Sequence, residues 1–116
     1  MRTDRRRAGA ALLGSLLAGA AATSSFGQEE MPTFRIELKD GAIVPDRLEV
    51  PAGVRFKILI ANTGTTPVEF ESLELKREKA VAPGDEVPLV FRRLDAGSYA
   101  FFDDFHPGSK ATLIAK

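Results

Sequence analysis

An all-β fold, a Greek-key β-sandwich of seven or eight short strands, is predicted by two properties of the sequence. Apolar and polar residues alternate in short segments, and turn-forming residues separate these segments about every ten residues. This regular spacing of strands and turns is typical of a sandwich. There is no cysteine among the 116 residues, so the small core must be stabilised by packing, aided at most by a bound ion.

Each predicted strand follows from a local pattern. The clearest alternation begins at Val54, and a proline at position 45 is best placed at a sheet edge or a bulge. The segment from Leu73 to Lys79 fits a strand preceded by an irregular crossing segment. The expected extended segments are 34–38, 43–50, 54–60, 68–72, part of 73–79, 87–91, 99–101 and 112–115. Turns are expected at 40–41, 51–53, 62–67, 82–84 and 95–97.

The first 27 residues read as a secretory signal peptide. Four arginines near the start precede an uncharged apolar run from residue 8 to 22, and small residues lead to a cleavage point before Gln28. A retained membrane anchor is the alternative, although the run is shorter than the ~20 residues of a typical span. Arg5, Arg6 and Arg7 also permit the twin-arginine route. We therefore expect a periplasmic protein.

Cleavage there would leave one domain, residues 28–116, of 89 residues. Removing four arginines and one aspartate leaves 12 basic and 15 acidic residues, a net charge near −3. No basic stripe with interleaved aromatic residues is present, so the composition does not indicate a nucleic-acid partner.

Three polar residues follow the aromatic strand near the C-terminus. Asp103, Asp104 and the only histidine, His106, offer oxygen and nitrogen donors at a spacing that could converge on one metal ion. The alternative is that the aspartates cap a turn and the histidine is an ordinary surface residue, because such short groupings are common.

Two glutamates form a second candidate group. Period-two alternation puts Glu69 and Glu71 on one side of a strand, opposite Phe70. Adjacent carboxylates repel each other unless a cation lies between them. The alternative is a solvated face whose charge is balanced by nearby basic residues. The basic residues within 75–79 could also supply counter-charge near a carboxylate-rich rim, or a docking surface for an acidic partner.

Hydrolytic templates fit poorly. Ser72, Ser98 and Ser109 are the serines that could join a Ser-His-Asp triad, but none lies in a nucleophile elbow. Paired carboxylates could in principle cut glycosides, yet so small a domain leaves little room for a substrate cleft. These patterns leave enzymatic activity open.

The order of residues resembles the cupredoxin family. The stretch from Ile43 to Asn62 is similar to the first half of a cupredoxin, and Tyr99-Ala-Phe-Phe-Asp103 with His106 and Gly108 resembles its closing segment. In that comparison Asp103 occupies the position of the copper-binding cysteine and Lys110 stands near the axial methionine. Glu69 and Glu71 replace the usual first histidine. The resemblance therefore implies a copper or iron ion in a site that is not blue, because the thiolate is missing.

Three strings are similar to those of cupredoxin-like domains that accompany bacterial iron permeases, the EfeO type. They are Glu69-Phe-Glu-Ser72, Leu75-Lys-Arg-Glu-Lys79 and Asp103-Asp-Phe-His-Pro-Gly108. This resemblance implies a periplasmic accessory of ferrous-iron uptake that binds copper or iron and helps to oxidise Fe(II), so that any enzymatic activity would be that of a ferroxidase-like accessory. Its partners would be components of the iron-permease system in the inner membrane and periplasm.

In a Greek-key sandwich the mid-chain loop and the last loop meet at one end, so the two candidate groups can lie close together. We expect Glu71, Asp103 and His106 to be metal ligands, with Glu69 and Asp104 as further ligands or as groups that orient them. A passive copper or iron carrier without redox turnover, and a docking sandwich without metal, are the alternative functions. A site with few donors could also be completed by a second chain in a homodimer.

Overall fold

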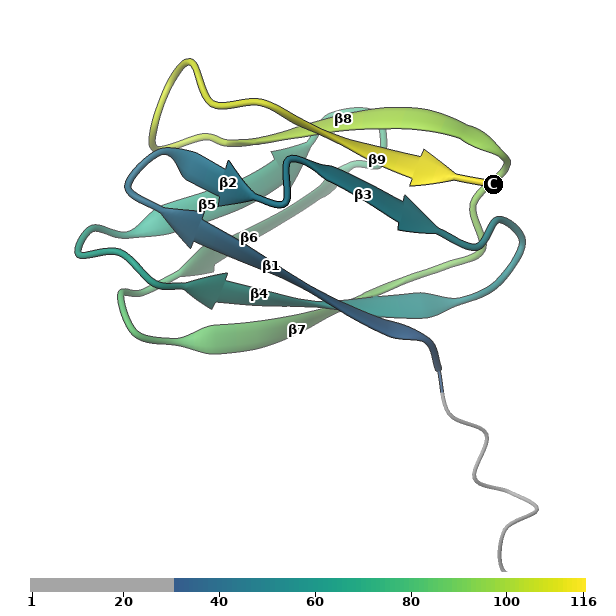
Figure 1. Ribbon diagram of the computed structural model, residues 1–116, viewed down its shortest axis with the longest axis horizontal. Coiled ribbons are helices and arrows are strands. Elements are labelled where there is room, and N and C mark those ends of the chain that lie inside the picture. Colours follow the sequence, from purple (N-terminus) through teal and green to yellow (C-terminus); the bar gives the residue numbers. More distant parts are fainter. Residues whose placement is uncertain (1–30) are drawn as a thin grey trace, which may run out of the picture. The chain divides into compact units, whose positions relative to one another are not determined.

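Two facing sheets make up the computed structural model, which describes residues 31–116 (Figure 1). The four-stranded sheet has the order β2-β1-β4-β7, and the five-stranded sheet has the order β3-β9-β8-β5-β6. The strands are β1 (Thr33–Lys39), β2 (Ala42–Val44), β3 (Arg47–Val50), β4 (Phe56–Asn62), β5 (Val68–Ser72), β6 (Arg77–Val81), β7 (Glu86–Phe91), β8 (Gly97–Asp103) and β9 (Ala111–Ala115). The predicted all-β sandwich is confirmed.

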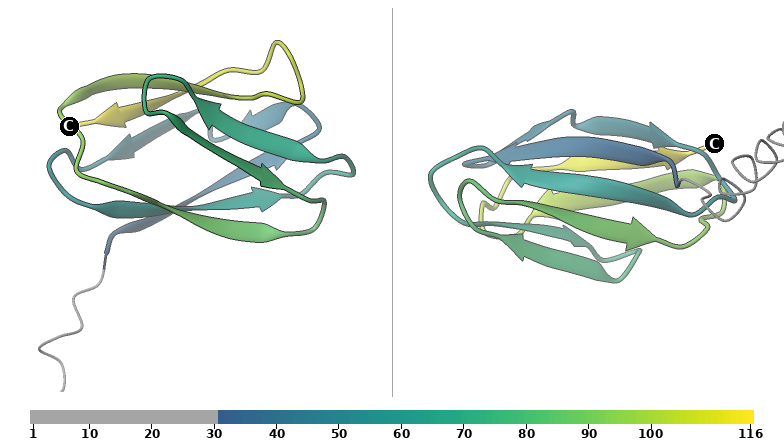
Figure 2. Two further views of the ribbon diagram at one scale, coloured as in Figure 1. Left: turned by 180° about the vertical axis from the view of Figure 1, so that it is seen from behind. Right: turned by 90° about the horizontal axis from the view of Figure 1, so that it is seen from below.

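The core lies between the two sheets, where the inward positions of the alternating strands are apolar. Four phenylalanines supply much of its volume. The rings of Phe56 and Phe91 stack with centroids 4.9 Å apart, and those of Phe70 and Phe101 stack at 5.1 Å. Phe70, which alternation places on the opposite side of its strand from Glu69 and Glu71, is almost completely buried. Figure 2 shows the two layers from behind and from below.

The stretch 43–50 differs from its prediction as one extended segment. It forms two strands, β2 and β3, which belong to different sheets, so the structure has nine strands. Pro45 lies between them and lacks the N–H that a continuous ladder requires. The chain therefore leaves the four-stranded sheet at Val44 and joins the five-stranded sheet at Arg47.

The end of the sandwich opposite the C-terminus, on the left in Figure 1, holds three connections that concern the predicted site, in addition to the β6–β7 connection. They are the β1–β2 turn at Asp40-Gly41, the β4–β5 loop and the β8–β9 loop. Both turn residues have positive φ, 46° and 100°, the conformation that a two-residue hairpin turn favours. The sequence expectation that the mid-chain loop and the last loop share one end is therefore met.

The predicted signal peptide, residues 1–27, lies outside the described residues. Among residues 31–116, no helix is long and apolar enough to cross a membrane.

The buried side chain of Asn62 holds the β4–β5 loop in place through hydrogen bonds. Its side-chain amide donates to the carbonyls of Thr66 and Val81 at 2.8 and 2.9 Å, and its oxygen accepts from the Gly64 N–H at 3.0 Å. We expect Asn62→Ala to lower the free energy of unfolding by about 2 kcal/mol, because it leaves buried backbone groups without partners. Urea titration measures the loss. The neighbouring exposed change Thr63→Ala should cost less than about 0.5 kcal/mol, and equal losses in both variants would contradict the assigned role.

Candidate metal centre

Three carboxylates meet on the outer face of the five-stranded sheet. Strand β5 alternates so that Phe70 enters the core while Glu69 and Glu71 face outward. Asp104 follows directly after the neighbouring strand β8, and its N–H donates to the Glu69 carbonyl at 2.9 Å. One ligand oxygen from each of Glu69, Glu71 and Asp104 lies within 4.8 Å of the other two. We call these three residues the carboxylate cluster.

A fourth carboxylate, Glu78, lies beside the carboxylate cluster. It sits directly opposite Glu71 in the antiparallel register of β5 and β6, so both side chains are on the same face. Like charges at directly opposed positions destabilise a sheet. The outer face therefore carries four neighbouring carboxylates, whose mutual repulsion is unfavourable unless a cation lies between them.

Within residues 31–116, the basic residues of β6 and of the turn before it form no ion pair with these carboxylates, although Lys76 lines a surface hollow together with Glu71 and Glu78. Arg77 lies opposite the buried Ser72, so it is on the other face of the strand. Its guanidinium donates to the Val90 carbonyl at 2.6 Å and lies 5.0 Å from the centre of the Phe91 ring. The ion pairs formed among residues 31–116 are Arg35–Glu37, Arg35–Glu86, His106–Asp103 and Lys116–Glu49. None of them includes a member of the carboxylate cluster.

The surroundings disfavour the charged form of the two glutamates. Partial burial raises the pKa of Glu69, and the charges of Glu78, Asp104 and Glu71 raise it further. Partial burial also raises the pKa of Glu71, followed by the charges of Asp104 and Glu78. A bound cation would lower both pKa values, because its positive charge favours the ionised form of each glutamate.

The raised pKa values predict that the metal-free protein loses stability as the pH rises above 4.5, the ordinary value for glutamate. Above that pH the unfolded chain is ionised, whereas the folded protein still holds protons on Glu69 and Glu71. Folding then binds protons, so stability falls until the pH passes the raised pKa values. Urea midpoints measured in chelator should show a weaker decline in Glu69→Gln/Glu71→Gln. Identical declines in the two proteins would contradict the prediction.

Asp103 is turned away from the carboxylate cluster and is completely buried. Its Oδ1 accepts from the backbone N–H of Glu69 at 2.9 Å and of Phe105 at 3.1 Å. Its Oδ2 lies 2.6 Å from Nδ1 of His106. Both carboxylate oxygens are therefore occupied by groups of the protein.

The His106 ring connects Asp103 to two further segments. Its Nε2 lies 3.1 Å from Oγ1 of Thr66, and the Thr66 hydroxyl donates to Asp40 at 2.7 Å. The Asp40 carboxylate also accepts the backbone N–H groups of Thr65 and Thr66. The Thr66 hydroxyl holds the pKa of Asp40 below its ordinary value, aided by these backbone N–H groups and by the nearby His106. We call Asp103, His106, Thr66 and Asp40 the hydrogen-bonded chain.

The structure thus divides the five predicted ligands into two neighbouring groups. Glu69, Glu71 and Asp104 bring their carboxylates together on the outer face, whereas Asp103 and His106 bond to each other and to the loops. Glu69 links the groups, because its backbone N–H contacts Asp103 while its carboxylate belongs to the cluster. A metal could bind His106 only if one of the two ring contacts were given up.

Sequence reasoning missed Glu78, Thr66 and Asp40. Glu78 could have been found from the hairpin register, because a turn at 73–76 between β5 and β6 necessarily places it opposite Glu71. Thr66 and Asp40 gave no such signal, since they belong to separate loops that only the folded sandwich brings together.

The family follows from a comparison with known proteins. The sequence profile of the family described as "Cupredoxin-like domain" matches residues 9–115. The chain belongs to this family. The uncharacterized protein RP394 of Rickettsia prowazekii (strain Madrid E) is 39% identical over 80 residues, which are 69% of this chain and 64% of that protein. The match therefore spans less than two thirds of the relative's length.

Solved cupredoxin structures share the fold at low identity. The purple cupredoxin from Nitrosopumilus maritimus has a TM-score of 0.55 and 18% identity, covering 71% of this chain and 98% of that one. Reduced auracyanin from Roseiflexus castenholzii has a TM-score of 0.62 and 15% identity, with 76% and 99% covered. The metal-binding domain of the Streptococcus pneumoniae D39 Cu(I)-exporting ATPase CopA has a TM-score of 0.58 and 17% identity, with 72% and 84% covered.

A blue copper ion does not fit the residues of this cupredoxin-like domain. Such a site needs a cysteine thiolate, and the sequence has no cysteine. Asp103, which the sequence comparison places at the cysteine position, is instead part of the hydrogen-bonded chain. Within residues 31–116, the group of acidic side chains whose ligand atoms lie close enough together to hold an ion is the carboxylate cluster.

Proposed function

We propose that this protein binds an iron ion as its cargo through Glu69, Glu71 and Asp104. The observation that carries the proposal is the convergence of three carboxylates on one outer face of the sheet, none of which forms an ion pair with a basic side chain among residues 31–116. Their mutual repulsion disfavours the empty site and is relieved by a cation. Glu78 adds negative charge and could serve as a further ligand.

The donor set favours a hard cation. Three carboxylate oxygens match the preference of hard ions for oxygen ligands, whereas Cu(I) prefers thiolates and thioethers. Oxygen donors of this kind also stabilise Fe(III) relative to Fe(II), which lowers the potential of the iron and makes loss of an electron easier. The site is exposed, so iron could enter and leave without a large rearrangement.

The wider role that we propose is that of an exported accessory of ferrous-iron uptake. Three sequence strings resemble those of the iron-permease-associated cupredoxin-like domains. The string at 69–72 contains Glu69 and Glu71, and the string at 103–108 contains Asp104. In this role the protein acts in the periplasm, binds Fe(II), and passes iron to a permease component. Oxidation would move one electron from Fe(II) to a bound copper ion or to a partner, and the product is Fe(III).

Passive carriage of iron or copper without redox turnover is the second candidate. The absence of redox turnover is favoured by the hydrogen bonds of Asp103 and His106. Because of these bonds, the carboxylate cluster has no imidazole ligand for a copper ion that could accept the electron. Stopped-flow oxidation of Fe(II), with and without copper, separates the two roles. Acceleration by the protein supports the accessory role, and tight iron binding without acceleration supports the carrier.

Metal content and affinity of the purified protein test the site itself. We expect the wild type to bind iron, and His106→Ala to bind it as well, because His106 lies outside the carboxylate cluster. Loss of iron binding in His106→Ala with retention in Glu71→Gln would move the site to the histidine. If the wild type bound neither iron nor copper by equilibrium dialysis, the metal-free docking sandwich would remain.

A further inference from the structure

A second candidate site lies on the other face of β6, away from the carboxylate cluster. Here the structure has a cavity of about 470 Å³, a volume within the range of small-molecule sites. Its walls come from the β5–β6 turn, from β6 and from the end of β7 with the segment that follows. The lining residues are Leu75, Arg77, Phe91, Arg92, Arg93 and Leu94. We call this cavity the arginine pocket.

The floor of the arginine pocket is apolar and rigid. Phe91 is almost completely buried and stacks on Phe56 at a centroid distance of 4.9 Å. Leu75 and Leu94 are half-buried and pack against the same core. Phe91 itself offers almost no surface to a ligand, because it is buried and the Arg77 guanidinium lies over its ring at 5.0 Å. An apolar group could instead cover Leu75 and Leu94 and gain the free energy of removing both surfaces from water.

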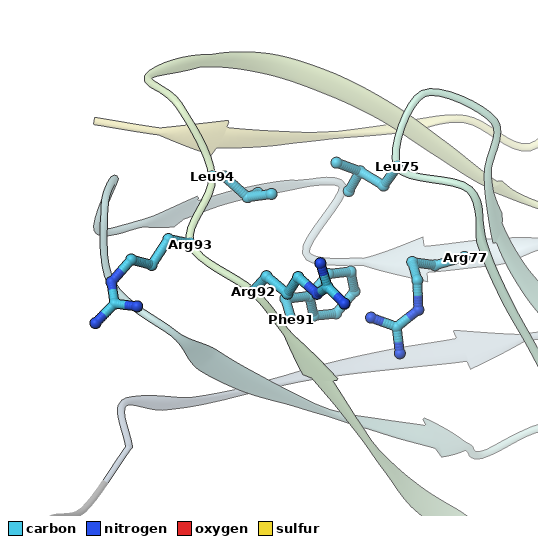
Figure 3. Close-up of a pocket in the computed structure, with 6 residues that line it drawn as sticks. All are labelled: Leu75, Arg77, Phe91, Arg92, Arg93 and Leu94. Carbon is cyan, nitrogen blue, oxygen red and sulfur yellow. The ribbon is translucent and has the colours of Figure 1, made fainter.

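The rim of the arginine pocket is cationic. Figure 3 shows the guanidinium groups of Arg77 and Arg92 in the region of the Phe91 ring, with Arg93 directed away from them. The ion pairs among residues 31–116 include none of these arginines. Two guanidinium groups at one cavity repel each other, and an anion between them would remove this repulsion.

Arg77 is already held in place before any ligand arrives. Its hydrogen bond to the Val90 carbonyl, 2.6 Å long, uses one nitrogen, and its guanidinium lies over the Phe91 ring. The remaining N–H groups keep the planar fork geometry that suits a carboxylate. Binding would therefore cost little conformational entropy at this side chain.

We infer that the arginine pocket binds a small organic carboxylate with an apolar body, held by Arg77 and Arg92 beside Leu75 and Leu94. The carboxylate receives charge-assisted hydrogen bonds from the guanidinium groups, and the apolar body rests against the two leucines. Inorganic phosphate would satisfy the arginines but leave the apolar floor exposed to water. This inference does not depend on iron binding, because no cluster residue lines the pocket.

Benzoate is the probe that we would use, with the purified protein followed by NMR. We expect benzoate to shift the resonances of the lining residues, and uncharged benzamide and inorganic phosphate to bind at least about tenfold more weakly. Arg92→Gln, in an exposed segment, should weaken benzoate binding about tenfold. Arg47→Gln removes an exposed arginine from β3 and is the matched control, which should bind benzoate as the wild type does.

Three results would overturn the inference. They are the absence of benzoate binding, equal affinity in the wild type and Arg92→Gln, and phosphate binding as tight as benzoate binding. Arg77→Gln provides a second variant, whose loss of affinity should be accompanied by loss of the hydrogen bond to Val90. Iron affinity should stay unchanged in Arg92→Gln, so failure here and failure of the carboxylate cluster can be told apart.

Discussion

Asp103→Ala is expected to lower the free energy of unfolding by about 3–5 kcal/mol. The Asp103 carboxylate is completely buried and is bonded to His106 and to the backbone N–H groups of Glu69 and Phe105. Alanine would leave all three partners without an acceptor and would open a small cavity. Buried donors that lose their partners carry the full cost of desolvation. Urea-induced unfolding followed by circular dichroism measures the loss.

Asp103→Asn is the matched variant. Its carbonyl oxygen can still accept the N–H groups of Glu69 and Phe105, while its amide replaces the carboxylate oxygen that contacts His106. We therefore expect a smaller loss than in Asp103→Ala. If Asp103→Ala and the wild type unfolded at the same urea concentration, the hydrogen-bonded chain would contribute nothing to stability.

The stabilising role of Asp103 extends to the loops at this end of the sandwich. The hydrogen-bonded chain connects the β8–β9 loop, the β4–β5 loop and the β1–β2 turn. Their approach is close, because a Cβ added at Gly64 would lie 2.7 Å from Oδ1 of Asp40 and 2.9 Å from its backbone nitrogen. A glycine is therefore needed at position 64, and any larger residue would push the β1–β2 turn away.

Glu69→Gln/Glu71→Gln is expected to reduce iron affinity by about 100-fold or more, since even residues outside the first coordination sphere change metal affinity by about 10–100-fold. The amide keeps the size of the side chain but removes two of the charges that attract the ion. Isothermal titration with a ferric chelate measures the change. Metal-dependent stabilisation should fall too, from about 2.7 kcal/mol at an iron concentration 100 times the wild-type Kd to about 0.4 kcal/mol in a variant that binds 100-fold more weakly.

The same double variant should be more stable than the wild type when both are metal-free. Removing two carboxylates removes the cost of partly burying their charges and the repulsion from the neighbouring carboxylates, which together raise the pKa values of Glu69 and Glu71. Weaker metal binding together with higher metal-free stability is the behaviour of a binding site, whereas a structural role would lower stability. Unchanged iron affinity, or a metal-free variant that unfolds more easily, would remove the assignment.

Glu49→Gln is the control for these measurements. Glu49 is an exposed carboxylate on β3, at the opposite edge of the same five-stranded sheet from β6, and it pairs with Lys116 at 3.5 Å. Glu49→Gln changes the net charge by the same amount as one Glu→Gln substitution in the carboxylate cluster. Iron affinity and metal-free stability should both stay close to the wild type, so a general effect of charge is separated from a local one.

Short-range patterns in the sequence determined most of the fold. Strict alternation in 34–38 and 68–72 predicted β1 and β5, because a strand with one buried face must place apolar residues at every second position. The absence of cysteine alone ruled out a blue copper site. The pair Glu69 and Glu71 was also predicted to share one face, since that follows from the period of a strand.

Contacts between distant residues were decided by the tertiary structure. The spacing of Asp103, Asp104 and His106 did not reveal that the first would be buried and the second exposed, because this depends on where β8 ends against β5. The position of Glu78 opposite Glu71 depends on the register of a hairpin, and the hydrogen-bonded chain depends on three loops meeting. Local periodicity fixes the face on which a side chain lies, whereas its partners are set by the packing of strands far apart in sequence.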